Sequence, residues 1–165
     1  MSITKKIQLK KMQLIVQNES FFLHILTEIK AGHQVIIPSK GNSMLPFIRP
    51  GTDEIELSPI DNNSIRKRNI VLAKTEEGNY VIHRIEKIDG DAITLRGDGN
   101  LTTREYCKRS NISAEVTAIL RKKKNNSKNR KIKKDNFRWI LHQKLWFSNP
   151  LLRRIYLGVN RRLKR

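Results

Sequence analysis

Apolar residues recur every three or four positions between Asn18 and Ala31, which is the spacing of one face of an α-helix. Gly32 follows directly, at the position where glycine commonly ends a helix. The pattern therefore predicts an N-terminal helix that ends near Gly32. Its start is expected at Asn18 or earlier, near Met12.

From residue 34 onward the apolar residues fall in short β-branched runs, which is the pattern of strands. Asp89-Gly90 separates two of these runs, and this dipeptide favours a two-residue hairpin turn. Many short strands with few helices between them predict a mainly β fold, built as a small curled antiparallel sheet. The predicted strands are 35–38, 54–57, 70–74, 80–88, 92–96 and 113–120.

The pattern changes after residue 120. Residues 121–134 contain almost no apolar side chains, so they are predicted to form a flexible basic linker. Beyond them we expect a helix capped by Asp135 and a second helix opened by Pro150, in which arginines lie largely opposite the apolar residues. The predicted organisation is a helical segment at 1–32, a β-rich domain at 33–120, the linker at 121–134 and an amphipathic helical tail at 135–165.

Positive charge is concentrated in the tail. The chain carries a net charge of +19, and residues 121–165 hold 17 basic residues and one acidic residue, against 17 and 14 in residues 1–120. Such a segment is expected to bind an anionic membrane surface, an exporter protein or nucleic acid. Because the apolar positions of the last helix share one face, the membrane is favoured over nucleic acid. A solvated tail that packs on the core is the remaining alternative.

Other sequence features indicate the cell compartment. No run approaches the roughly 20 apolar residues that a membrane-spanning helix needs. The lysine-rich N-terminus is followed by Glu19 and Glu28 and by no signal-peptide cleavage site. Cys107 is the only cysteine, so an intrachain disulfide is impossible, and we interpret it as a packing residue. We expect a cytoplasmic chain that attaches peripherally to the inner face of the membrane.

Three residues in order could supply serine-hydrolase chemistry. Ser43 lies in a predicted loop, His83 in a predicted strand and Asp98 in a glycine-rich turn. A serine hydroxyl is a weak nucleophile until a base takes its proton, imidazole can act as that base, and a carboxylate can orient the ring. Gly41 leaves space for backbone amides, including that of Ser43, to approach a developing oxyanion.

The residues around these three make the pattern specific. The chain contains Gly-x-Ser-Met-x-Pro at 41–46, Pro-Gly-x-Asp at 50–53, His-Arg-Ile at 83–85 and Gly-Asp-x-Asn at 97–100. This order resembles the signal peptidase I family, whose wider relatives include the self-cleaving repressors of the SOS response. The resemblance covers roughly residues 33–120, and histidine in the base position is typical of the endoplasmic-reticulum type.

The resemblance implies a role for each matching residue. Ser43 corresponds to the nucleophile, His83 to the general base and Asp98 to the carboxylate that orients the base. It also implies a β-rich fold that cleaves extended peptides after a small residue and uses no metal or cofactor. The other motif residues are expected to support the site, and they are Met44, Pro46, Asp53, Arg84, Gly97 and Asn100.

Several of these residues also have a structural interpretation. We expect Asp53 to shape the turn after Pro50-Gly51, and Arg84 to form an ion pair with Asp98 or with another carboxylate. His24, His33 and His142 lack the spacing of metal ligands and are interpreted as ordinary residues.

The expected function is a serine endopeptidase of the signal peptidase type that cleaves leader or signal segments of peptide or preprotein substrates. Two alternatives come from other classes. The first is a catalytically inactive β module that binds peptides. The second is a self-cleaving transcriptional repressor, which is less favoured because only about 40 residues precede the Ser43 loop, too few for a DNA-binding domain and a linker.

Overall fold

The computed structural model describes residues 18–122, 130–148, 154–155 and 158. Within these residues one antiparallel sheet of eight strands is accompanied by two helices and a short 3₁₀ turn. The predicted mainly β fold with a curled antiparallel sheet is therefore confirmed. The elements are α1 (Asn18–Lys30), β1 (Val35–Pro38), β2 (Asp53–Ser58), β3 (Ile70–Lys74), β4 (Tyr80–Asp89), β5 (Ala92–Arg96), β6 (Glu105–Lys108), η1 (Arg109–Asn111), β7 (Ile112–Arg121), β8 (Arg130–Lys133) and α2 (Phe137–Ser148).

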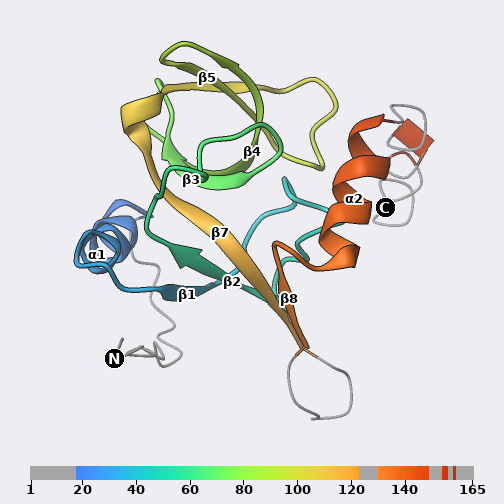
Figure 1. The fold of residues 1–165 in the computed structure, drawn as a ribbon, viewed down its shortest axis with the longest axis horizontal. Coiled ribbons are helices and arrows are strands. Elements are labelled where there is room, and N and C mark those ends of the chain that lie inside the picture. Colours follow the sequence, from blue (N-terminus) through green and yellow to red (C-terminus); the bar gives the residue numbers. More distant parts are fainter. Residues whose placement is uncertain (1–17, 123–129, 149–153, 156–157, 159–165) are drawn as a thin grey trace.

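The long strand β7 organises the sheet. The strand order is β1-β2-β7-β3-β4-β5-β6, with β8 also paired to β7. Ile112 to Glu115 of β7 pair with β3, whereas Ala118 to Arg121 pair with β8. The β3 to β5 part of the sheet curls over, and α1 and α2 lie at opposite sides of the sheet (Figure 1). Register shifts in the pairings of β7 and of β4 with β5 accompany this curl, because bulges increase local twist.

Two clusters of buried apolar side chains form the core. The larger cluster lies between α1, β1, β2, β7 and α2, and it includes Ile25, Leu57 and Trp139. The smaller cluster lies within the β3 to β6 curl, and it includes Leu95 and Cys107. Helix α2 therefore contributes to the main core.

The local predictions are confirmed where periodicity was strong. Helix α1 ends at Lys30, and Gly32 has the positive φ of +85° that favours glycine after a helix. The six predicted strands are present. The β4–β5 hairpin also forms, but Asp89 pairs with Ala92, so its central residues are Gly90 and Asp91. The turn is thus one residue later than predicted.

Two predictions in the C-terminal third are corrected. Arg121 ends β7 and residues 130–133 form β8, so these parts of the predicted linker belong to the sheet; residues 123–129 lie outside the described residues. Helix α2 is capped by Asn136, whose side chain accepts a hydrogen bond from the Arg138 amide, and not by Asp135. The predicted start of the first helix near Met12 and most of the predicted helix after Pro150 also lie outside the described residues.

Candidate active site

The loop from β1 to β2 carries Ser43 and is anchored by the residues that follow it. The side chains of Met44, Phe47 and Ile48 are buried in the main core, while Ser43 is half-buried. Gly41 has a positive φ of +72°, a backbone conformation that side chains other than glycine rarely adopt. The sequence thus places a small residue at 41 for a conformational reason, and its role beside an oxyanion stays a prediction.

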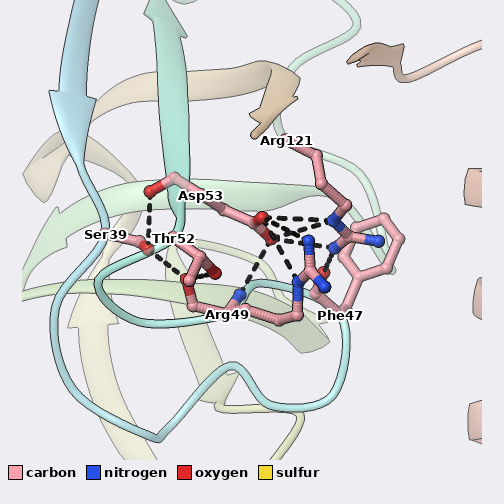
Figure 2. Close-up of polar contacts among 6 residues, drawn as sticks. All are labelled: Ser39, Phe47, Arg49, Thr52, Asp53 and Arg121. Atoms are coloured by element: carbon pink, nitrogen blue, oxygen red, sulfur yellow. Dashed lines mark hydrogen bonds and ion pairs between the residues drawn. The ribbon is translucent and has the colours of Figure 1, made fainter. Parts of the chain in front are cut away.

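The end of this loop is fixed by the carboxylate of Asp53 (Figure 2). Arg121 donates to it from Nε at 3.1 Å and from Nη2 at 2.8 Å, and the backbone amide of Arg49 donates at 3.0 Å. Burial raises the pKa of Asp53, but the hydrogen bonds from Arg121 and Arg49 outweigh it, so the pKa lies below its usual value of 3.8. Arg121 also donates to the Phe47 carbonyl at 2.7 Å. Asp53 therefore has the structural role predicted for it.

The Ser43 loop rests directly on the Gly97 to Asn100 turn. The Gly99 amide donates a hydrogen bond to the Ser43 carbonyl at 2.7 Å. A Cβ atom at Gly97 would collide with that carbonyl, and one at Gly99 would lie 2.6 Å from the Asn42 carbonyl. Both glycines are needed because backbone packs on backbone here. The turn is closed by the Asn100 amide, which donates to the Gly97 carbonyl at 3.1 Å.

Asp98, at the centre of this turn, is bound by Arg84 and not by His83. Arg84 donates from Nε at 2.9 Å and from Nη2 at 2.6 Å to the two carboxylate oxygens, and both side chains are fully buried. Arg84 also donates to the Arg68 carbonyl at 2.7 Å. A buried carboxylate needs such a bidentate partner. The prediction of an Arg84–Asp98 ion pair is confirmed, and the placement of Asp98 against the imidazole is wrong.

The carboxylate beside His83 belongs to Glu105 at the start of β6. His83 Nδ1 lies 2.9 Å from Glu105 Oε2, and the two side chains are 5% and 18% exposed. A carboxylate accepts hydrogen bonds, so this contact places the ring proton on Nδ1 and leaves the lone pair of Nε2 for another partner. Sequence reasoning missed Glu105 because β6 was not predicted. The available signal was an acidic residue shortly after the Gly-Asp-x-Asn motif.

Strand β4 connects the two parts of the candidate site. His83 and Arg84 are consecutive on β4, and Arg84 pairs in register with Arg96, the last residue before the Gly97 turn. His83 therefore lies beside the strand end that leads to the turn under the Ser43 loop. The structure joins Ser43 to the turn and His83 to Glu105. A contact between Ser43 Oγ and His83 Nε2 stays a prediction.

The remaining candidates have structural surroundings. Cys107 is buried in the smaller core, as predicted, and burial raises the pKa of its thiol to about 11. Among the described residues, no group of three or more His, Cys, Asp or Glu side chains is placed to hold a metal ion. Across the same part of the chain, every helix is too short or too polar to span a membrane.

No protein-family model matches the chain, and no curated protein matches it either. The fold and the site define only a class: a curled antiparallel β domain that holds a serine loop, a glycine turn beneath it and a histidine–carboxylate pair between β4 and β6.

Proposed function

We propose that the protein is a serine endopeptidase of the signal peptidase type, with Ser43 as nucleophile, His83 as general base and Glu105 as the residue that orients the base. The observation that carries the proposal is the contact between His83 Nδ1 and Glu105 Oε2, on a strand whose next residue holds the turn under Ser43. Histidine held by a carboxylate on one ring nitrogen is an arrangement that can activate a serine nucleophile.

The reaction follows from these roles. Ser43 Oγ attacks the scissile carbonyl and forms a C–O bond while His83 Nε2 takes the hydroxyl proton. Glu105 stabilises the imidazolium that results, and His83 returns the proton to the leaving amine as the C–N bond breaks. A water molecule then hydrolyses the ester by the same proton transfers, which restores Ser43. Arg84 and Asp98 stay an ion pair throughout and hold the turn that supports the nucleophile.

The sheet suggests how an extended substrate binds. Strand β1 is at one end of the strand order, and it leads within a few residues to the loop that carries Ser43. A peptide that added to this edge as a further strand would use main-chain hydrogen bonds and would run toward Ser43. The proposed substrates are therefore leader or signal segments in extended conformation, from peptides or preproteins.

The outer face of α2 suggests a second partner. Its large apolar side chains Phe137, Ile140, Leu141 and Leu145 are exposed, and Arg138 and Lys144 are exposed on the same helix. The helix contains no acidic residue, and it belongs to a segment with 17 basic residues and one acidic residue. Apolar side chains beside cations suit an anionic lipid surface. We propose that this face binds the membrane, in preference to nucleic acid or an exporter.

Peptide cleavage tests the proposed activity. Purified protein is incubated with a library of extended peptides, and cleavage products are identified by mass spectrometry. Ser43→Ala and His83→Ala are each expected to lower the cleavage rate by about 10⁴ or more with the fold retained. Ser110→Ala, which changes an exposed serine of η1, is the matched control and should cleave like the wild type. If the wild type and all variants bind peptides but cleave none of them, the inactive binding module is favoured.

A further inference from the structure

The inner face of α2 contacts both segments that make up the candidate site. The Phe47 ring of the Ser43 loop packs edge-on against Trp139 at 4.9 Å and stacks on His142 at 4.4 Å, measured between ring centroids. His142 in turn stacks on Trp146 at 5.4 Å. Trp146 Nε1 donates a 2.9 Å hydrogen bond to the backbone carbonyl of Asp98, in the turn beneath Ser43.

These contacts form a closed ring that begins and ends at Asp98. The Asp98 carboxylate binds Arg84, and the Arg84 guanidinium lies 5.4 Å from the centroid of the Phe47 ring. Phe47 stacks on His142, His142 on Trp146, and Trp146 binds the Asp98 carbonyl. The Ser43 loop and the glycine turn are thus connected three times: by the direct bond from Gly99 to Ser43, through Arg84, and through α2.

We propose that α2 is a clamp that positions the Ser43 loop on the glycine turn, and that Trp146 and His142 are its positioning residues. This inference rests on the proposed function, because it assigns the clamp to the reactivity of Ser43. Two backbone segments that approach without side chains between them have few contacts of their own to fix their relative position. The contacts of His142 and Trp146 supply that restraint from α2, which begins more than 35 residues after the turn.

His142 makes the clamp sensitive to protonation. Both ring nitrogens are buried and have no hydrogen-bond partner among the described residues. The pKa of His142 is lowered to about 4, chiefly because the ring is buried; Asp98 raises it in part, and Arg84 and Arg121 contribute to lowering it. The charged groups that face the ring are Asp98 of the turn, Arg84 of β4 and Arg121 of β7. When α2 is undocked, His142 has its ordinary pKa of 6.5 and takes up a proton below that pH. In the docked helix the ring stays neutral until the pH approaches 4. Docking therefore weakens as the pH falls from 6.5 toward 4.

Two tryptophans on one helix provide a matched test. Trp146→Phe and Trp139→Phe remove the same ring atoms from buried positions, but only Trp146 donates to the turn, since Trp139 Nε1 is buried without a partner. The readouts are the second-order rate of Ser43 labelling by a fluorophosphonate and hydrogen exchange of the Gly99 amide. Trp146→Phe should slow labelling about tenfold and speed Gly99 exchange, whereas Trp139→Phe should change labelling less than threefold at equal folded fraction. Equal effects of the two variants on both readouts would overturn the clamp.

A second variant keeps the test independent of folding losses in Trp146→Phe. His142→Phe preserves an aromatic ring between Phe47 and Trp146 but cannot take up a proton. The wild type should show faster Gly99 exchange as the pH falls from 6.5 toward 4, after correction for the intrinsic pH dependence of exchange, and His142→Phe should lack that change. The same acid response in both proteins contradicts the role of His142. If the wild type labels no faster than Ser43→Ala, the proposed function fails, and the exchange data still decide whether the clamp exists.

Discussion

His83 Nδ1 lies 2.9 Å from Glu105 Oε2, across 22 positions of sequence and between strands β4 and β6. Strand geometry explains why Glu105, and not Asp98, occupies this place. Successive side chains of a strand point to opposite faces, so His83 and the adjacent Arg84 meet different neighbours. One face brings Glu105 to His83, and the other brings Asp98 to Arg84.

Replacement of the Glu105 carboxylate should impair catalysis with little effect on folding. Glu105→Gln keeps the size of the side chain but can donate to Nδ1, which favours the wrong tautomer of His83. We expect the cleavage rate to fall by roughly 10²–10⁴. Steady-state kinetics on a cleaved peptide measure the loss. The control Glu77→Gln changes an exposed turn residue and should be neutral; an unaltered rate in Glu105→Gln would exclude the orienting role.

Loss of the Asp98 charge should mainly affect stability. Asp98→Asn leaves the fully buried Arg84 guanidinium without its counter-charge, and breaking a buried pair in this way costs about 3–5 kcal/mol. Denaturant unfolding measures the change in the free energy of unfolding. Asp89→Asn removes the exposed partner of Lys87, an ion pair that water screens, and should leave the stability nearly unchanged. Similar losses in the two variants would show that the Arg84–Asp98 pair does not hold the turn.

The close approach of the glycine turn predicts a steric effect on the nucleophile. Gly97→Ala places a Cβ atom against the Ser43 carbonyl, so the loop must move away from the turn. We expect Ser43 labelling to slow by at least tenfold. Gly32→Ala is the control, because it has no neighbour within 4 Å and its positive φ costs about 1 kcal/mol far from the site. Wild-type labelling in Gly97→Ala would mean that the turn does not position Ser43.

The outer face of α2 predicts selective binding to anionic lipid. The wild type should sediment with phosphatidylglycerol vesicles at physiological salt and not with phosphatidylcholine vesicles. Leu141→Glu with Leu145→Glu should weaken this binding at least tenfold, because it removes apolar contact and adds negative charge at the exposed face. Thr102→Glu with Thr103→Glu makes the same charge change at exposed positions outside α2 and is the control. Protein that sediments with neither kind of vesicle but binds duplex DNA or RNA would contradict the membrane proposal.

Local patterns in the sequence predict much of this fold. Helix α1 and the six predicted strands have enough apolar residues at regular spacing to be recognised without a partner. Strands β6 and β8 each bury one apolar residue, Cys107 and Ile132, and owe their conformation to pairing with β5 and β7. Such strands depend on contacts that are distant in sequence, so composition alone does not reveal them.

The same limit applies to the candidate site. The motifs locate Ser43, His83 and the glycine turn because backbone packing restricts the residue types there. They do not show which carboxylate contacts His83 and which contacts Arg84. Those contacts depend on the strand faces and on the register of β4, β5 and β6. The contact between α2 and the turn is equally hidden, because its hydrogen bond from Trp146 ends on a backbone carbonyl.

The site of covalent labelling shows whether His83 activates Ser43. Intact protein is treated with a fluorophosphonate, digested and mapped by mass spectrometry. If His83 activates Ser43, we expect one adduct, on Ser43, which is absent in His83→Ala even though circular dichroism shows that variant to be folded. An adduct on another serine, or Ser43 labelling at the wild-type rate in His83→Ala, would contradict it.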